Sequence, residues 1–248
     1  MLEVRNVAIR FGGLRAVEDV SLDVPRGSIT ALIGPNGAGK TTLFGLVSGF
    51  LRPHAGSVRF EERDITGLAP HTICRLGMVR TFQIVQPFGA QSVRENIAIG
   101  AHLRIPSRRA ALAYAEAIAM RVGLADALDQ LAANLTVAGR KRLELARALA
   151  TGPRLLLLDE VLAGLNPQEV AAMIPVIRRI REEGVTVFMI EHVMQAVMNL
   201  AEHVWVLNHG RLAASGTPAD VVANPAVIEA YLGHGAAERL KQGGVAHA

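Results

Sequence analysis

Short apolar runs separated by glycine-rich turns recur in the first third of the chain and again in its last third. Residues 3–9 and 20–24 alternate or run apolar, and residues 28–33 form a third run, so each stretch predicts a β-strand. Shorter runs at 57–60 and 77–81 predict two more strands. The chain therefore opens as a strand-rich unit, with turns at Gly12-Gly13 and in the Pro53 to Gly56 stretch.

The pattern changes between residues 87 and 151, where alanine and leucine recur with a helical period. Ser107 is a suitable N-cap for a helix that runs to about Val122. Residues 140–150 predict another helix, which ends before Gly152-Pro153. We therefore expect a helical insertion within the strand-rich part.

Strands return after this insertion. The unbroken apolar run Leu155 to Leu158 is typical of a parallel strand buried on both faces. A helix is expected from Asn166-Pro167 to near Gly184, with Pro175 kinking it or removing a hydrogen bond. Residues 185–190 predict a further buried strand.

The C-terminal part predicts a hairpin. Residues 204–207 and 211–214 flank the turn signal Asn208-His209-Gly210. Two short helices are expected at 218–223 and 225–232, followed by a flexible tail over about 236–248. The fold class is therefore α/β, with a mostly parallel sheet, an antiparallel β edge and an inserted helical subdomain.

Composition limits the function classes. The 248 residues are 50% hydrophobic, enough for one good-sized core, yet no apolar run reaches the length of about 18 residues that a membrane span needs. One cysteine and no apolar N-terminal signal region favour a reducing, cytoplasmic setting. The net charge of +4 comes from scattered basic residues without a nucleic-acid-binding module, so we expect no nucleic-acid partner.

One glycine-rich stretch fits the phosphate-binding loop pattern, in which a glycine, four residues and a second glycine precede lysine and threonine. A predicted strand precedes it and a predicted helix follows it. Its backbone N–H groups and the helix N-terminus suit phosphate oxygens, the lysine reaches terminal phosphates, and the threonine hydroxyl suits Mg²⁺. Its residues are Gly34, Pro35, Asn36, Gly37, Ala38, Gly39, Lys40, Thr41 and Thr42.

Two adjacent carboxylates, Asp159 and Glu160, follow the buried run at the point where that strand ends. Ligands of open α/β sheets gather at the carboxyl ends of parallel strands. Asp159 suits a Mg²⁺ shared with Thr41, and Glu160 suits a base that positions an attacking water. The alternative is a surface carboxylate pair.

Three further residues have both an ordinary and a functional interpretation. Phe11 is either a core ring or a platform that stacks on a nucleotide base. Gln83 at a strand end is unremarkable alone, and His192 after the strand at 185–190 is either structural or a phosphate contact.

Three basic residues lie in the first turn of a predicted helix, namely Arg140, Lys141 and Arg142. Either water screens their charges or an anion binds at this helix end.

The order and spacing of these motifs resemble the ATPase subunits of ATP-binding cassette (ABC) transporters over nearly the whole chain, residues 1–248. The resemblance rests on residues 34–42, 81–83, 155–160, 163–167 and 191–192. It implies core-lobe segments at about 1–86 and 152–235 around a helical subdomain at about 87–151. It also implies that Phe11 stacks on adenine with Val17 near it, that Gln83 and Asp159 act at Mg²⁺, that Glu160 polarises water, and that His192 contacts the γ-phosphate.

Residues 11–17, 163–167, 214–218 and 224–233 are similar to the branched-chain amino-acid uptake ATPases. This resemblance implies an ATP- and Mg²⁺-dependent importer subunit, peripheral on the cytoplasmic face of the cell membrane. The implied partners are two transmembrane permeases and a second ABC ATPase, in a homo- or heterodimer. A solute-binding protein outside the membrane would act indirectly, and the cargo would be branched-chain amino acids or a related small polar solute.

The family signature Leu-Ser-Gly-Gly-Gln falls here on residues 135–139 with substitutions. Thr136 keeps a hydroxyl for the opposite subunit's γ-phosphate, Ala138 adds a Cβ where glycine is usual, and Gly139 replaces a polar residue. Val193 replaces the aspartate that usually follows the histidine. A regulatory, non-transport cassette with weak turnover is therefore the alternative, and a small-molecule kinase is a third interpretation, against which the Asp159-Glu160 pair and the helical insertion argue.

Overall fold

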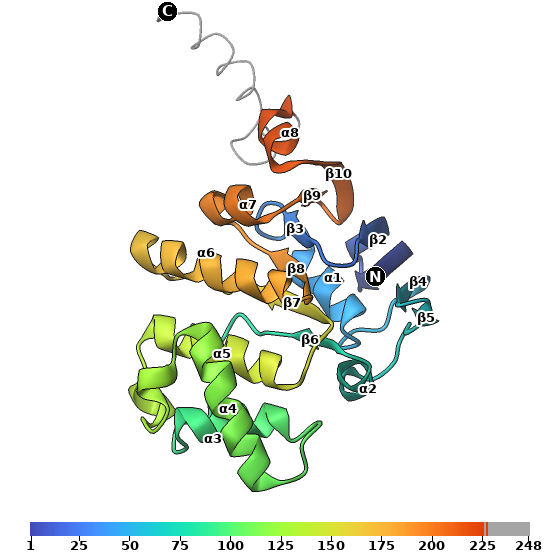
Figure 1. The fold of residues 1–248 in the computed structure, drawn as a ribbon. Helices are drawn as coiled ribbons and strands as arrows, with labels where there is room; N and C mark the ends of the chain where they lie inside the picture. Colours follow the sequence, from blue (N-terminus) through green and yellow to red (C-terminus); the bar gives the residue numbers. More distant parts are fainter. Residues whose placement is uncertain (226, 228–248) are drawn as a thin grey trace, which may run out of the picture.

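Two β-sheets of different type form the strand-rich part of the computed structural model, which describes residues 1–225 and 227 (Figure 1). The larger sheet has the order β10-β9-β3-β8-β7-β6, and all of its neighbouring pairs are parallel except β9 with β10. Its strands are β3 (Ile29–Ile33), β6 (Met78–Arg80), β7 (Leu155–Asp159), β8 (Thr186–Ile190), β9 (His203–Asn208) and β10 (Arg211–Gly216). The expected parallel sheet and its antiparallel hairpin edge are confirmed.

The smaller sheet is antiparallel and has the order β2-β1-β4-β5. Its strands are β1 (Leu2–Phe11), β2 (Leu14–Val24), β4 (Ala55–Phe60) and β5 (Arg63–Asp64). β2 begins six residues before the predicted strand at 20–24. It extends that far because Leu14 pairs with Phe11 directly across the Gly12-Gly13 turn.

Helices cover the sheets and fill the middle of the chain. They are α1 (Lys40–Val47), α2 (Pro70–Arg75), α3 (Val93–Ala101), α4 (Arg108–Val122), α5 (Val137–Ala150), α6 (Pro167–Glu182), α7 (Met194–Leu200) and α8 (Pro218–Ala223). α3, α4 and α5 contact one another and lie together at the bottom of Figure 1. Ser107 caps α4 as predicted, through a hydrogen bond from the Ala110 N–H.

Two helix predictions need correction. α5 begins at Val137 instead of residue 140, because the Thr136 side chain accepts the Gly139 N–H and caps the helix there. α2 has no counterpart in the sequence prediction, and α3 lies within the expected helical insertion but is not predicted there as a separate helix. α6 begins after Asn166 as predicted and continues through Pro175 to Glu182. The helix expected at 225–232 and the tail at 236–248 fall almost entirely outside the described residues.

β7 shows why an unbroken apolar run was the correct signal for a central strand. All five of its residues are buried, but alternate side chains enter different cores. Leu156 and Leu158 pack in a cluster with helices α3 to α7, whereas Leu155 and Leu157 pack in a second cluster with α1 and the antiparallel sheet. The middle helices thus share their core with one face of the parallel sheet.

Because β3, β6, β7 and β8 run parallel, the segments that follow them meet at one edge of the sheet. These segments hold the phosphate-loop residues, Gln83, the Asp159-Glu160 pair and His192. Among the helices of the described chain, none combines the length and apolar character that crossing a bilayer demands.

Candidate nucleotide site

The loop between β3 and α1 takes a conformation that requires glycine. Gly34, Gly37 and Gly39 have φ values of 154°, 79° and 102°, in the region that side-chain-bearing residues rarely adopt. A Cβ on Gly34 would lie 2.1 Å from the Leu207 carbonyl oxygen, and one on Gly39 would lie 2.3 Å from that of Ala16. The loop is therefore held tightly against β9 and β2.

Lys40 is the first residue of α1, and its side chain folds back over the loop. Its Nζ donates hydrogen bonds to the carbonyl oxygens of Gly34 at 2.7 Å and Pro35 at 3.0 Å. Burial lowers the pKa of the Lys40 ammonium, while the carboxylates of Glu160 and Asp159 act to raise it. The two hydrogen bonds fix the Lys40 amine at the mouth of the loop.

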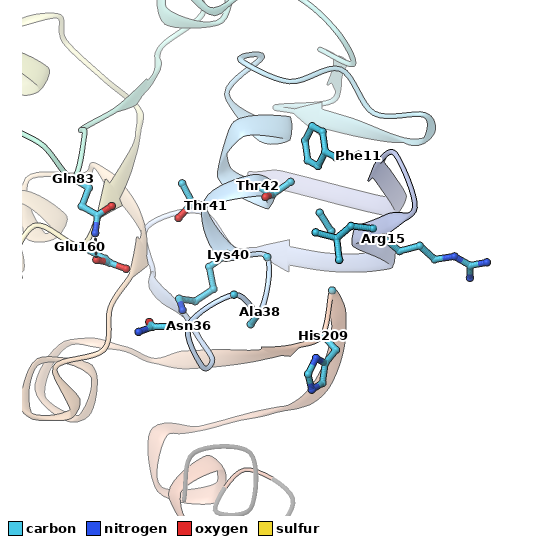
Figure 2. Close-up of a pocket in the computed structure, with 15 residues that line it drawn as sticks. Phe11, Arg15, Asn36, Ala38, Lys40, Thr41, Thr42, Gln83, Glu160 and His209 are labelled. Atoms are coloured by element: carbon cyan, nitrogen blue, oxygen red, sulfur yellow. Dashed lines mark hydrogen bonds between the residues drawn. The ribbon is translucent and has the colours of Figure 1, made fainter. Parts of the chain in front are cut away.

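A pocket opens above this loop and brings distant segments together. Most of the loop lines it, from Asn36 to Thr42, together with Phe11, Gln83 and Glu160. Figure 2 shows Gln83 and Glu160 side by side, across the pocket from Lys40 and Thr41. Phe11, at the end of β1, is 48% exposed, so its ring offers a free apolar surface to this pocket.

Val17 is the one base-contact prediction that the structure places elsewhere. Its side chain is 1% exposed, packs in the second core cluster and does not line the pocket above the loop. Its neighbour Ala16 does line that pocket. Successive side chains of a strand point to opposite faces, so both residues cannot face the nucleotide pocket.

The two carboxylates at the end of β7 line two different pockets beside the loop. Asp159 ends the strand and lines a second pocket with Thr41 and Gln83, whereas Glu160 lines the first pocket. Glu160 has a positive φ of 48°, which turns the chain at the strand end and brings both side chains toward the loop. The alternative of a carboxylate pair on the free surface is excluded, because Asp159 is 1% exposed.

The surroundings of Asp159 fit a divalent cation. Its Oδ2 accepts a hydrogen bond from Arg80 Nη2 at 2.6 Å, but its Oδ1 is buried and has no hydrogen-bond partner among the described residues. A buried carboxylate oxygen without a partner is costly unless something binds it. With the Thr41 hydroxyl lining the same pocket, the donor set consists of oxygens, which Mg²⁺ prefers.

Gln83 and His192 converge on Glu160. Gln83 Nε2 donates to Glu160 Oε2 at 2.6 Å, and His192 Nδ1 lies 3.9 Å from the same oxygen. The His192 side chain is half exposed. Thr136, Ala138 and Gly139 lie at the start of α5 and line neither of the two pockets around the phosphate loop.

Of the basic residues at 140–142, Lys141 is not the water-screened surface residue that one interpretation expects, because it is buried, whereas Arg140 is exposed. Each side chain donates to backbone carbonyls: Arg140 to Ala133, Arg142 to Val122, and Lys141 to both Gln83 and Glu160. Lys141 is buried, at 7% exposure, and lies on the second turn of α5. It therefore ties α5 to the two loops that carry the polar residues.

Several site residues have no counterpart in the sequence prediction. Arg80 reaches Asp159, Lys141 reaches Glu160, and His209 and Gly210 line the pocket from the hairpin turn. Glu191 is fully buried, and its carboxylate accepts the Leu162 N–H at 3.1 Å. Arg80 and Glu191 could have been found from the sequence, because each is a charged residue at the end of an apolar strand. Charged residues are rarely buried there unless they form an ion pair or belong to a functional site.

A glycine loop between a strand and a helix, with a buried acidic residue at the end of a neighbouring parallel strand, defines the class of phosphate-binding-loop nucleotide hydrolases. Comparison with known proteins narrows this class. A sequence model described as "ABC transporter" matches residues 17–163, and one described as "Branched-chain amino acid ATP-binding cassette transporter" matches residues 211–237. The chain belongs to the ABC transporter ATP-binding family and is an ATP-hydrolysing enzyme.

Relatives cover almost the whole chain. It is 41% identical over 249 residues to the high-affinity branched-chain amino acid transport ATP-binding protein BraF of Pseudomonas aeruginosa, covering 94% of this chain and 98% of the relative. The corresponding LivG protein of Escherichia coli is 40% identical with the same coverage. A crystal structure of the ADP conformation of an ATP-binding cassette of an ABC transporter superposes with a TM-score of 0.85 at 33% identity, covering 94% of this chain and 99% of that one.

Proposed function

We propose that this chain is the motor subunit of an ABC importer and that ATP hydrolysis at the loop 34–42 powers uptake of branched-chain amino acids or a related small polar solute. The observation that carries the proposal is the meeting of Lys40, Asp159, Glu160 and Gln83 at one edge of the parallel sheet. The relatives named for branched-chain amino acid transport support the cargo class. They favour the importer over a regulatory cassette.

Within the site, we assign each role from chemistry and position. The loop N–H groups and Lys40 bind the phosphates, and the Phe11 ring stacks on the base. Thr41, Asp159 and Gln83 hold Mg²⁺, which when bound neutralises phosphate charge. Glu160 accepts a proton from the attacking water, and His192 approaches the γ-phosphate. The division into a core lobe (about 1–86 and 152–235) and a helical subdomain (about 87–151) is part of the proposal.

A second copy or a paralogous ATPase completes the site in this proposal. Thr136, Ala138 and Gly139 lie away from the chain's own phosphate pockets, which suits a contact with the ATP of the opposite subunit. Two permeases anchor the pair on the cytoplasmic face of the membrane, and a solute-binding protein delivers the cargo. Closure on ATP and release after hydrolysis drive the permeases.

The test is a tagged pull-down of the full chain from detergent-solubilised membranes of the source cell, read by mass spectrometry. We expect two multi-helix permeases and a second ATPase. The associated solute-binding protein is then screened with leucine, isoleucine, valine, urea and short amides. Recovery of soluble partners alone, with ATP binding intact, contradicts the importer. Binding of none of these solutes contradicts the proposed cargo, whereas binding of urea or an amide but no amino acid selects the related small polar solute.

A further inference from the structure

Arg80 occupies an unusual position for an arginine. It ends β6, three residues before Gln83, and its side chain is only 9% exposed. The rings of Phe44, Phe50 and Phe82 surround its guanidinium, with centroids 5.9, 5.8 and 5.7 Å from Cζ. Ring faces attract a guanidinium, and rings on several sides restrict its movement.

The guanidinium is directed at Asp159. Arg80 Nη2 donates to Oδ2 at 2.6 Å, and Nη1 lies 3.4 Å from Ser48 Oγ. Asp159 is itself 2% exposed at its side chain, so this is a buried ion pair. Thr81 fixes the backbone beside it, because its Oγ1 accepts the Asp159 N–H at 3.2 Å. The carboxylate is therefore held from its side chain and from its backbone.

This arrangement leaves a single oxygen of Asp159 for other partners. Oδ2 is occupied by Arg80, whereas Oδ1 is buried and, within residues 1–225 and 227, has no hydrogen-bond partner. Asp159, Arg80 and Thr41 line the same pocket. A carboxylate that is fixed through one oxygen keeps the other at a constant place, which is how partners of a ligating carboxylate orient it.

We propose that Arg80 is the positioning residue of the metal-binding carboxylate: by holding Asp159 Oδ2, it presents Oδ1 to the divalent cation that enters with ATP. This inference rests on the proposed function, which places Mg²⁺ between Asp159 and Thr41. The aromatic cage of Phe44, Phe50 and Phe82 keeps the guanidinium in register with the carboxylate. Arg80 does not touch the nucleotide or the reacting water.

Two effects of Arg80 on metal affinity oppose each other. Repulsion between the guanidinium and the cation weakens metal binding, and fixation of the carboxylate strengthens it. The negative nucleotide phosphates offset the charge of the divalent cation. The three aromatic ring faces interact with the positive charge of the guanidinium. Both effects reduce the repulsion between Arg80 and the cation. We expect fixation to dominate.

The test measures metal binding without turnover. Mn²⁺ replaces Mg²⁺, and its dissociation constant is measured by electron paramagnetic resonance on the full chain with a saturating non-hydrolysable ATP analogue. For Arg80→Met we expect Mn²⁺ affinity to fall by about 10- to 100-fold. Affinity for the analogue in EDTA stays unchanged, because Arg80 does not line the pocket above the loop.

Arg154→Met is the matched control. Arg154 also forms an ion pair, with Glu61 at 2.5 Å, and lies 5.6 Å from the Phe60 centroid, but it lines neither phosphate pocket. We expect the Arg154→Met protein to bind Mn²⁺ with the same affinity as the wild type. An Arg80→Met protein that folds and binds Mn²⁺ as tightly as the wild type, or more tightly, overturns the inference.

Arg80→Lys keeps the test decisive where Arg80→Met fails to fold. Lysine keeps the charge but is a point donor without the planar fork, so we expect an intermediate loss of about three- to tenfold. Unchanged Mn²⁺ affinity in Arg80→Lys shows that Arg80 acts only through its charge and does not position the Asp159 carboxylate. If wild type binds no nucleotide-dependent Mn²⁺ and Asp159→Asn changes nothing, the proposed metal site fails instead.

Discussion

Gln83 Nε2 donates a hydrogen bond to Glu160 Oε2 across 2.6 Å, so the loop after β6 is joined to the residue after β7. His192 Nδ1 lies 3.9 Å from the same oxygen. The proposed base therefore has its orientation set by an amide, with an imidazole beside it. Any substitution of Glu160 must be judged by whether it preserves this contact.

Glu160→Gln is predicted to separate binding from chemistry. The glutamine amide oxygen still accepts the Gln83 N–H, so the pocket keeps its shape, but an amide cannot take a proton from water. We expect the ATPase rate to fall by about 10²- to 10⁴-fold and ATP affinity to stay within about threefold. Steady-state phosphate release and equilibrium ATP binding check this, with the exposed Glu202→Gln as the control. A Glu160→Gln rate near wild type would show that Glu160 is not the base.

Lys141→Met is predicted to destabilise the fold. Lys141 Nζ donates to the carbonyl oxygens of Gln83 and Glu160, and it is a buried cation near the carboxylates of Glu191 and Glu160. Burial lowers the pKa of Lys141, and those carboxylates act to raise it. We expect the free energy of unfolding to fall by about 2 kcal/mol or more, since hydrogen bonds to a charged group are lost in a buried place.

Arg140→Met is the matched control for Lys141→Met. Arg140 is the adjacent residue and also donates to one carbonyl, that of Ala133 at 2.8 Å, but it is exposed. We expect a loss below about 1 kcal/mol, typical of a surface position. Denaturant unfolding of both variants measures the difference. Equal losses would mean that the link from α5 to the two loops contributes little to stability.

The sequence predicts the central strands and the phosphate loop well and the charged contacts poorly. The run Leu155 to Leu158 and the pattern at 34–42 locate β7, β3 and the phosphate loop because apolar periodicity and loop spacing are local features. The roles of Arg80 and Lys141 depend on partners 79 and 19 residues away. A charged residue at the end of an apolar strand marks Arg80 as unusual, but its pairing with Asp159 appears only when the sheet brings β6 beside β7. Lys141 on α5 has no such local signal.

Phe11→Ala is predicted to weaken ATP binding without destabilising the protein. The ring lies at the rim of the nucleotide pocket and is 48% exposed, so its removal creates no core cavity. Stacking on a base contributes about 1–3 kcal/mol, so we expect ATP affinity to fall by about tenfold. Phe11→Trp restores it, because an indole offers a similar flat face. Titration of a fluorescent ATP analogue measures all three proteins, and unchanged affinity in Phe11→Ala would place the base elsewhere.

Glu191→Gln is predicted to make stability less dependent on pH. Burial raises the pKa of Glu191 from 4.5 to about 7; the Leu162 N–H opposes this, and the nearby Glu160 carboxylate adds to it. Between pH 4.5 and about 7 the folded chain keeps a proton that the unfolded chain has lost, so the free energy of unfolding falls as pH rises through this window. The full loss is about 3 kcal/mol and is reached above about pH 7.

Glutamine cannot ionise, but its oxygen still accepts the Leu162 N–H, so the variant escapes this loss. We expect Glu191→Gln to match the wild type near pH 4.5 and to exceed its unfolding free energy by about 3 kcal/mol at pH 8, a value that already includes partial compensation of the charge by Lys141. Denaturant unfolding at pH 5, 6, 7 and 8 measures the difference, with the exposed Glu182→Gln as a control whose difference stays flat. A constant gap between Glu191→Gln and wild type across this range would show that Glu191 is ionised throughout, held by the adjacent Lys141 ammonium.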